Sequence, residues 1–329
     1  SEHKTTVKTE VMAGITTFMT MAYILAVNPS VLGSTGMDTT AVLLATALAS
    51  CLGTLCMAFM ANLPFALSAG MGLNAFMAYT VVAGYGYSWQ VALLAVFIEG
   101  LIFIVLSLTN VREAIFNAIP LTLKKGVSVG IGLFIAFIGL QNSGLCVDSA
   151  TLVGIISFPE NFHTAGICAL LTLIGLFFTA VFYTRKMKGA ILYGILLTWI
   201  LGMLCQVTGL YVPTPDAGFY SLFPSWGMTD FSKLGLTFGQ CFNVDFSAVG
   251  IVNFIVVIFS FLFVDIFDTL GTLIGVATKA KMLDKDGKLP GIKPALMADS
   301  IATSAGAILG TSTTTTFVES ASGVAVGGR

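Results

Sequence analysis

The sequence predicts an all-α polytopic membrane protein. Hydrophobic residues make up 56% of the 329 residues, charged residues make up 9%, and the mean hydropathy is +0.95. Soluble domains carry about 25% charged residues, so this chain lacks the charge to cover a surface that faces water. Apolar residues occur in blocks of helical length, without the alternation that marks a transmembrane barrel. Together with a net charge of −1, this composition excludes a disordered chain, a secreted disulfide scaffold and a nucleic-acid-binding protein.

Ten apolar spans follow one another along the chain, and the first has no cleavable signal. We expect them at residues 11–27, 39–60, 70–82, 89–108, 121–140, 164–183, 190–208, 247–272, 295–309 and 317–329. The third and tenth are too short to cross a bilayer as plain helices. Segment 209–246 is partly polar and contains three prolines, which indicates an external loop with an interfacial turn.

Basic residues predict the orientation, because cytoplasmic loops are enriched in Lys and Arg. With a cytoplasmic N-terminus, 13 of the 15 basic residues lie on the inside, only Lys233 lies outside, and Arg329 is unassigned. The basic residues placed inside are Lys4, Lys8, Arg112, Lys124, Lys125, Arg185, Lys186, Lys188, Lys279, Lys281, Lys285, Lys288 and Lys293. We therefore expect the N-terminus in the cytoplasm.

The sequence offers no sign of a catalytic, metal or cofactor site. It contains no HExxH motif, and its two histidines, His3 and His163, lie outside the spans. The six cysteines form no CxxC pair and no Cys/His cluster, so we interpret them as small apolar side chains. An intramembrane enzyme is therefore disfavoured.

A weak internal repeat connects two of the spans. Residues 44–55 (LATALASCLGTL) match residues 297–308 (MADSIATSAGAI) at a constant offset of 253, mainly at alanines and glycines. The two copies would cross the membrane in opposite directions, which is typical of an inverted-repeat transporter. If the first repeat has seven spans ending near residue 208, the chain covers about spans 1–10, and roughly four more belong to the whole repeat.

The two short spans occupy matching positions in the two copies. Residues 64–76 begin with a proline and pass through glycines, and residues 311–328 begin with the threonines 313–316, which favour a strand. We expect each to contain a short strand followed by a half-helix. Non-helical backbone at membrane depth must be buried in protein or line a cavity, and here the half-helix N-termini would point into that cavity.

Five acidic residues fall inside spans, where a carboxylate costs about 2.5–3.5 kcal/mol at the bilayer centre. They are Glu99, Asp265, Asp268, Asp299 and Glu319. The spacing of Asp265 and Asp268 puts them on one helical face with Thr269 and Thr272, which predicts a face toward a cavity, the alternative being helix–helix hydrogen bonding. Glu319, where the strand meets the half-helix, suits either a ligand contact or a plain N-cap.

Five other side chains have a structural interpretation, and most of them a functional one as well. Asp299, at the cytoplasmic start of its span, is expected to be only partly buried, as a helix-start carboxylate, a conformational latch or a binding group. Glu99 suits helix packing. Asn74 carries donors and acceptors and suits either packing or a ligand contact. Phe65 and Phe317 occupy near-equivalent places and could flank a flat ligand, although core packing is the ordinary role of Phe.

A cavity with several carboxylates and no basic residue suits a cation or a neutral solute rich in N–H donors. A desolvated carboxylate also takes up protons. This predicts a cycle in which a carboxylate is protonated outside, the substrate binds, the protein rearranges, and both are released inside.

Four stretches resemble a known family: TEVMAGITTFMTMAYILAVNPSVL (9–32), SAGMGLNAFMAYTVV (68–82), FVDIFDTLGTLIGVA (263–277) and TSTTTTFVESASGVAVGGR (311–329). They are similar to the nucleobase–cation symporter 2 family, and most similar to its azaguanine-like branch of hypoxanthine, guanine and adenine permeases. The resemblance implies 14 spans in two inverted seven-span repeats, with strands in spans three and ten. It also implies a core domain (1–110 and 247–329) that moves against a gate domain (111–246) in an elevator-like manner.

The resemblance also implies roles for site residues. Asp265 and Glu319 would accept hydrogen bonds from purine N–H groups, Asn74 would support the site, and Asp268 would tune it or relay a proton. From their positions beside these residues, we also expect Phe317 and Thr269 in the substrate site, and Asp299 in proton coupling or site tuning. The motif at residues 319–323 is one residue longer than in the broader family, so only Glu319 is carried over there.

The expected partners are a purine nucleobase, a proton and the bilayer of the cytoplasmic membrane, with a homodimer left open and no nucleic acid. The leading alternative is an anion carrier or channel of the same fold, against which the lack of Lys or Arg in spans one to nine speaks. A membrane scaffold without transport would leave the buried acidic residues without a reason.

Overall fold

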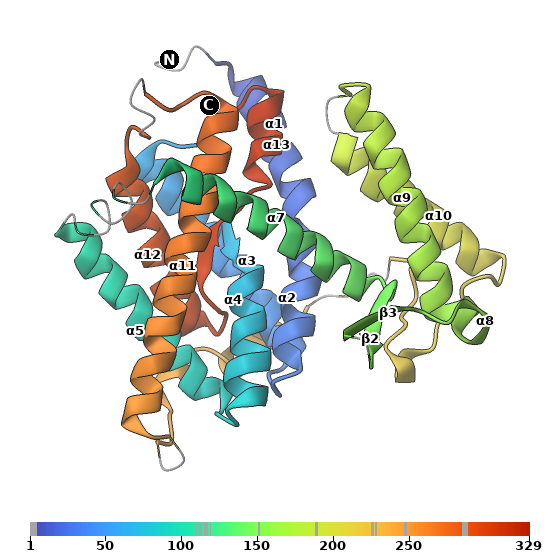
Figure 1. Cartoon of the computed structure of the whole chain (residues 1–329), viewed down its shortest axis with the longest axis horizontal. Coiled ribbons are helices and arrows are strands. Elements are labelled where there is room, and N and C mark those ends of the chain that lie inside the picture. Colours follow the sequence, from blue (N-terminus) through green and yellow to red (C-terminus); the bar gives the residue numbers. More distant parts are fainter. Residues whose placement is uncertain are drawn as a thin grey trace. The chain divides into compact units, whose positions relative to one another are not determined.

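The computed structural model describes residues 5–109, 111, 114, 118, 120–150, 152–187, 190–224, 227, 229–246, 249–284 and 289–329. These residues are mostly helical, and the chain divides into two compact units (Figure 1). Unit 1 consists of Ser1–Ile131 and Thr229–Arg329, and unit 2 of Gly132–Met228. Helix α7 (Leu121–Asn142) contains the boundary between the two units.

The first half of unit 1 follows the predicted spans with two interruptions. The first span is split, because α1 ends at Met21 and α2 begins at Ile24. The third span is broken into a strand, a short α-helix and a π-helical segment. The elements are α1 (Val7–Met21), α2 (Ile24–Gly33), α3 (Thr39–Cys56), η1 (Met57–Ala61), β1 (Leu67–Ala69), α4 (Met71–Ala75), η2 (Phe76–Gly84) and α5 (Trp89–Leu108).

The second half of unit 1 repeats this order of a long helix, a strand and a short helix. Its elements are η5 (Phe231–Leu236), η6 (Gln240–Phe242), α11 (Ile251–Ala280), α12 (Ile292–Leu309), β4 (Thr314–Thr316) and α13 (Ser320–Val326). The segment that contains η5 and η6 is bonded to the end of α12. Thr237 Oγ1 donates to Leu309 O at 3.0 Å and Gly239 N donates to Ile308 O at 2.7 Å, so these bonds satisfy carbonyls that the helix leaves without partners.

Strands β1 and β4 pair antiparallel, which confirms the short strands expected in the two broken spans. The pairs are Leu67 with Thr316, Ser68 with Thr315, and Ala69 with Thr314. The backbone pairing extends one residue at each end, through Gly70 N to Thr313 O and Phe317 N to Ala66 O, both at 2.9 Å. All six strand residues are buried. This pairing satisfies the extended backbone in the interior, as a hydrocarbon environment requires.

Small residues bring the helices around this strand pair close together. Helix α12 packs against both α5 and α3. A Cβ on Gly100 of α5 would lie 3.1 Å from Ser304 Cα, and one on Gly53 of α3 would lie 2.9 Å from Ala302 Cβ. Close approach at glycine is the usual way in which helices pack in a membrane.

Unit 2 is built around a pair of antiparallel helices, α9 (Ile167–Thr184) and α10 (Ala190–Val207), which lie side by side in Figure 1. A β-hairpin precedes them, which the sequence analysis did not predict. The hairpin and smaller elements are β2 (Cys146–Ser149), β3 (Leu152–Ile155), α8 (Phe158–Asn161), η3 (Phe162–Gly166) and η4 (Pro215–Ala217).

Five helical stretches among the described residues are long and apolar enough to cross a membrane. They are Val7–Gly33, Thr39–Ala61, Trp89–Leu108, Phe158–Thr184 and Ile251–Ala280. Met71–Gly84 and Tyr193–Val207 are shorter apolar helices. Their positions agree with the first, second, fourth, sixth and eighth predicted spans, and the two shorter ones with the third and seventh.

Candidate functional site

Residues 311–316, which we call the hydroxyl segment because all six side chains carry a hydroxyl, contact several helices at once. All six residues are at most 1% exposed. The segment's bonds are Asn28 Nδ2 to Thr311 Oγ1 (2.8 Å), Ser312 Oγ to Asn74 Oδ1, Thr313 Oγ1 to Glu99 Oε2 (2.9 Å), Thr303 Oγ1 to Thr314 O (3.0 Å) and Thr315 Oγ1 to Asp268 Oδ2 (3.1 Å). Successive residues therefore bind α2, α4, α5, α12 and α11.

Asp265, Thr269 and Asp299 form one buried group between α11 and α12. The Thr269 hydroxyl lies 3.0 Å from Asp265 Oδ1 and 3.2 Å from Asp299 Oδ2, and all three residues are at most 1% exposed. The expectation that Asp299 is only partly buried is wrong. Helix α12 begins at Ile292, so Asp299 lies about two turns inside the helix, where α12 packs against its neighbours.

Asp268 lies one turn along α11 and faces β4 and the start of α4. It accepts a hydrogen bond from Thr315, and a Cβ on Gly70 would lie 3.3 Å from Asp268 Oδ2. The four carboxylates of the predicted site lie on α11 and α12, which both pack against β4, and at the residue just before α13. Asp268 is the one with a described hydrogen bond to β4.

Glu319 binds a side chain from the beginning of the chain. Tyr23, at the break between α1 and α2, donates its hydroxyl to Glu319 Oε1 at 2.6 Å. Glu319 occupies the N-cap position of α13 but makes no capping bond, so the plain N-cap interpretation is wrong. The reason is conformational: its φ of −59° and ψ of −20° are helical, whereas a capping side chain needs extended backbone.

Asn74 and Phe317 lie on other sides of the hydroxyl segment. Asn74 is 1% exposed and accepts a hydrogen bond from Ser312, while its Nδ2 donor has no partner among the described residues. Phe317 is buried with Met21, Ile24 and Ala66. Phe65 belongs to a different apolar cluster, so the two phenylalanines do not form one aromatic face.

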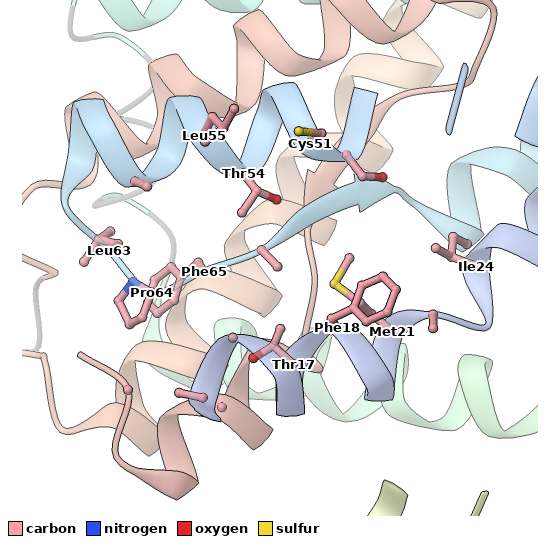
Figure 2. Close-up of a pocket in the computed structure, with 18 of the residues that line it drawn as sticks. Thr17, Phe18, Met21, Ile24, Cys51, Thr54, Leu55, Leu63, Pro64 and Phe65 are labelled. Carbon is pink, nitrogen blue, oxygen red and sulfur yellow. The ribbon is translucent and has the colours of Figure 1, made fainter. Parts of the chain in front are cut away.

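An apolar pocket of about 470 Å³ lies between α1, α3 and residues 63–66. Figure 2 shows Phe18 and Met21 of α1 and Thr54 of α3 on the two sides of the segment that leads into β1. None of the seven predicted site residues lines it. The four predicted site carboxylates therefore do not line the pocket, although its lining residues Met21, Ile24 and Ala66 pack against Phe317.

Two partners of the site were missed by the sequence analysis. Tyr23 was not singled out, and the hydroxyls at 311–316 were interpreted only as strand formers. A signal for the second was present, since six consecutive hydroxyl side chains beside buried carboxylates supply donors that an apolar strand would lack. No group of three His, Cys, Asp or Glu side chains suited to a metal ion occurs among the described residues.

A family model, described as the Permease family, matches residues 8–329. The chain belongs to this Permease family. The predicted membership of the nucleobase–cation symporter 2 family is thereby confirmed, and with its apolar helices this permease is a multi-pass membrane protein.

Curated relatives match the whole of this permease and are longer than it. A permease from Methanocaldococcus jannaschii is 48% identical over 329 residues, which are 100% of this chain and 70% of the relative. The guanine/hypoxanthine permease PbuO of Bacillus subtilis is 44% identical (100% and 72% covered), and the adenine permease AdeP of Escherichia coli is 41% identical (100% and 69% covered).

One solved structure shares the fold. The transmembrane domain of a cyanobacterial bicarbonate transporter, BicA, superimposes with a TM-score of 0.57 at 14% identity, over 98% of this permease and 77% of that domain. At this identity the similarity concerns the fold alone, which is that of a transmembrane transporter domain.

Proposed function

We propose that this permease carries purine nucleobases (hypoxanthine, guanine or adenine) into the cell together with protons. The observation that carries the proposal is the arrangement of Asp265, Asp268, Asp299 and Glu319 around the paired strands of two broken spans. The hydrogen bonds described for these carboxylates come from neutral Thr and Tyr hydroxyls, and a carboxylate can accept further hydrogen bonds from a ligand. The names of PbuO and AdeP support a purine as that ligand.

In this proposal the purine is bound through its N–H groups. Glu319, held at Oε1 by the Tyr23 hydroxyl, accepts one of them through its remaining acceptor sites, and Asp265, supported by Thr269, accepts another. The unused Nδ2 donor of Asn74 suits a purine ring nitrogen or carbonyl. Phe317 contributes an apolar aromatic surface beside Glu319. The purine would thus meet two acceptors, one donor and one ring.

The proton is assigned to the remaining carboxylates. Asp299 shares the Thr269 hydroxyl with Asp265 in a fully buried setting, and two adjacent buried charges are costly, so we assign the coupled proton to Asp299. Asp268, which accepts a hydrogen bond from Thr315 of β4, would tune the site or relay the proton. Proton uptake on one side of the membrane would then prepare the site for the purine.

We further propose an inverted seven-plus-seven repeat, with a core domain (1–110 and 247–329) moving against a gate domain (111–246) in an elevator-like manner. The matching order of α3, β1 and α4 with α12, β4 and α13 supports the repeat, as does the antiparallel pairing of β1 with β4. A cytoplasmic N-terminus and the cytoplasmic membrane remain part of this proposal, and a homodimer stays open.

Uptake of radiolabelled purines by cells that express the full-length protein tests the site. Glu319→Gln and Asp265→Asn should each abolish uptake while the protein still reaches the membrane at normal amounts. Asp148→Asn, at an exposed position of β2, is the matched control and should transport normally. Wild-type uptake by both site variants would reject the site assignment.

Competition distinguishes the proposal from an anion carrier of the same fold. Excess unlabelled hypoxanthine, guanine or adenine should suppress uptake, and sulfate or bicarbonate should have no effect. A protonophore should reduce uptake if the purine enters with a proton. If sulfate or bicarbonate inhibited uptake and the purines did not, the result would favour an anion carrier.

A further inference from the structure

The two helices at the centre of unit 2 touch through two matching contacts between Gly and Thr. Gly175 of α9 faces Thr198 of α10, where an added Cβ would lie 3.1 Å from Thr198 Cβ. Gly194 of α10 faces Thr179 of α9, where the same distance would be 2.9 Å. Each threonine hydroxyl donates to the glycine carbonyl four residues earlier on its own helix, at 2.7 Å for Thr179 and 2.8 Å for Thr198. The hydroxyls are therefore satisfied and the helices approach closely.

These contacts define the register of the antiparallel pair. Four residues forward on α9, from Gly175 to Thr179, correspond to four residues back on α10, from Thr198 to Gly194. The same register holds in the other direction, because an added Cβ on Gly202 would lie 3.8 Å from Leu171 Cδ1. The next facing pair in this register, three residues further on, is Cys168 with Cys205.

Hydrogen bonds fix the helix ends on the far side of this cysteine pair. His163 Nδ1 donates to Leu210 O at 3.1 Å, and Val212 N donates to His163 O at 2.9 Å. The cysteine pair therefore lies between the Gly–Thr contacts of α9 with α10 on one side and the hydrogen bonds of His163 with Leu210 and Val212 on the other. Both thiols are free in this structure.

The surroundings of the two cysteines restrict their movement and still leave the thiols accessible to a small reagent. Both cysteines are half-buried and pack at the edge of an apolar cluster formed by Ile167, Leu171 and Tyr211. Cys168 lies in the first turn of α9 and Cys205 in the last turn of α10, at the end of the hairpin opposite to the turn that contains Arg185. In the proposed topology this end faces the outside, the more oxidising compartment.

We propose that Cys168 and Cys205 are a redox-sensitive thiol pair that closes to a disulfide across the α9–α10 hairpin. With a small disulfide such as oxidised glutathione as oxidant, one cysteine thiolate attacks a glutathione sulfur and releases one reduced glutathione. The second cysteine then attacks the resulting mixed disulfide at the protein sulfur and releases the other. Two protein thiols are oxidised, the glutathione disulfide is reduced to two thiols, and the two protons pass to the released glutathione.

The bond would close a loop that includes the basic turn between the two helices, and would prevent α9 and α10 from sliding or separating. The remaining cysteines do not offer a comparable pair among the described contacts. Cys51 and Cys56, for example, lie on one helix five residues apart, which places them on different faces. The proposal is independent of the substrate that the permease carries.

The test uses the purified full-length protein, treated with oxidised glutathione or with dithiothreitol. In a variant with Cys51, Cys56, Cys146, Cys241 and any cysteine outside residues 1–329 changed to serine, the number of maleimide-reactive thiols should fall from two to none after oxidation and return to two after reduction. Adding Cys168→Ser to this variant provides the matched control, in which Cys205 should stay reactive or carry glutathione, without an internal cross-link.

If the variant without the other cysteines fails to fold, peptide mapping of the oxidised wild-type protein tests the same proposal. A cross-linked peptide that joins residues 168 and 205 is expected, and the Tm should be several degrees higher in the oxidised than in the reduced form. Cys168→Ser should abolish that difference. Two alkylatable thiols at 168 and 205 after oxidation, or cross-links only between molecules, would overturn the proposal.

Discussion

At the scale of single residues, the hydrogen bond between Tyr23 and Glu319 joins the break in the first span to the broken tenth span. Its length of 2.6 Å fits a strong bond from a hydroxyl to a carboxylate. Such a bond favours one rotamer of the Glu319 side chain. We therefore expect Tyr23 to position Glu319 for the substrate.

Tyr23→Phe should raise the KM for purine uptake roughly tenfold, because a bond to a charged group is worth about 1.5–3 kcal/mol and only part of it would act on affinity. The phenyl ring keeps the packing of Tyr23 and removes only the hydroxyl. Tyr79→Phe, at a residue that is 58% exposed, is the matched control. An unchanged KM in Tyr23→Phe would show that the hydroxyl does not position Glu319.

The sequence predicted part of this site because some of its geometry is local. The face shared by Asp265, Asp268 and Thr269 follows from helical spacing alone, and the strand at 314–316 follows from a run of β-branched residues. Tyr23 lies 296 residues before its partner, so no local pattern announces their contact. The burial of Asp299 also depends on packing between distant helices rather than on its place in one span.

At the scale of elements, α13 is held against α1 by residues without bulk. An added Cβ on Gly323 would lie 2.7 Å from the carbonyl oxygen of Ala13 and would also meet Thr17. Gly14 of α1 differs from Gly323, because no atom lies within 4 Å of a Cβ added there. Gly323 is therefore required for the close approach of the two helices, and Gly14 is not.

Gly323→Ala should lower the Tm and reduce uptake, because overpacking a close helix contact typically costs about 1–3 kcal/mol. Gly14→Ala is the matched control on the other helix, where alanine should be neutral or slightly stabilising. Thermal unfolding of both variants in the same detergent provides the measurement. Equal Tm values for the two alanine variants would contradict the packing argument.

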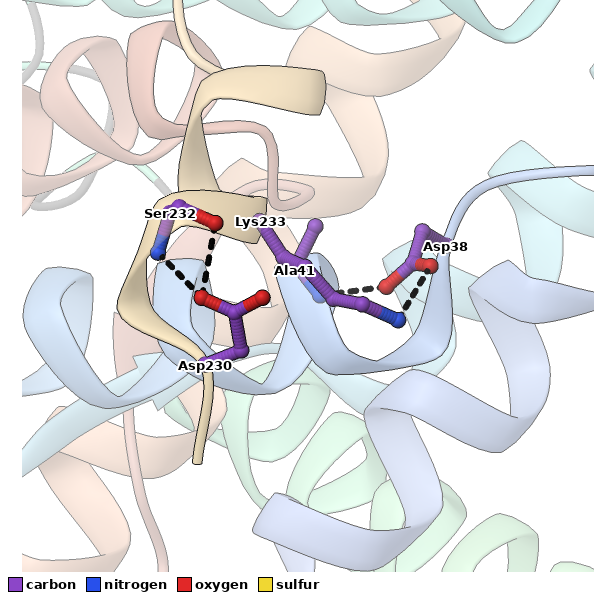
Figure 3. Close-up of polar contacts among 5 residues, drawn as sticks. All are labelled: Asp38, Ala41, Asp230, Ser232 and Lys233. Carbon is purple, nitrogen blue, oxygen red and sulfur yellow. Dashed lines mark hydrogen bonds and ion pairs between the residues drawn. The ribbon is translucent and has the colours of Figure 1, made fainter. Parts of the chain in front are cut away.

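An ion pair connects η5 with the start of α3 (Figure 3). Lys233 Nζ lies 3.2 Å from Asp38 Oδ2, and Asp38 also caps α3 through Ala41 N at 2.9 Å. The hydrogen bond from the Ala41 amide, together with the Lys233 ammonium, holds the pKa of Asp38 below its usual value. Ionised Asp38 therefore stabilises the fold above the unfolded-state value of about 3.9, and this contribution is lost as the pH falls through the lower folded-state pKa.

Asp38→Asn should lower the Tm slightly at pH 7, by an effect on the order of 0.2–1 kcal/mol, because Asn keeps the cap but loses the charge. The difference from wild type should shrink as the pH falls below about 4. Lys233→Met, which removes the ammonium group that pairs with Asp38, should also lower the Tm at pH 7. A Tm difference that is independent of pH would indicate that the charge of Asp38 does not contribute.

Most elements could be predicted because long apolar blocks leave little choice in a membrane. The span at 89–108 agrees at both ends with α5, where Ser88 accepts from Val91 N as an N-cap. The interruption between α1 and α2 was missed, since residues 22 and 23 carry no Gly or Pro. The hairpin β2–β3 was missed as well, because its strands alternate little between apolar and polar residues.

At the scale of the whole molecule, the two units differ in how they are held together. Unit 1 is organised around buried polar bonds from the hydroxyl segment, whereas unit 2 depends on close helix contacts at Gly175 and Gly194. Both units contain helices that are long and apolar enough to cross a membrane. The direction in which each helix crosses therefore has to be determined for both units. The distribution of Lys and Arg predicts that orientation.

Single cysteines in a background without other cysteines test the orientation. Lys233→Cys should react with a membrane-impermeant maleimide in intact cells, because the Lys233 side chain is 41% exposed and is predicted to lie outside. Lys186→Cys, in the turn between α9 and α10, should react only after permeabilisation. The reverse pattern would place the N-terminus outside and would contradict the predicted topology.

The hydroxyl segment has a consequence for how this family can vary in length. The side chains of Thr311, Ser312, Thr313 and Thr315 bind four different helices, and side chains along a strand alternate between two faces. Inserting or deleting one residue near position 311 would turn every hydroxyl to the opposite face and break all of these bonds at once. We therefore expect related chains to tolerate substitutions within the segment far more readily than any change in its length.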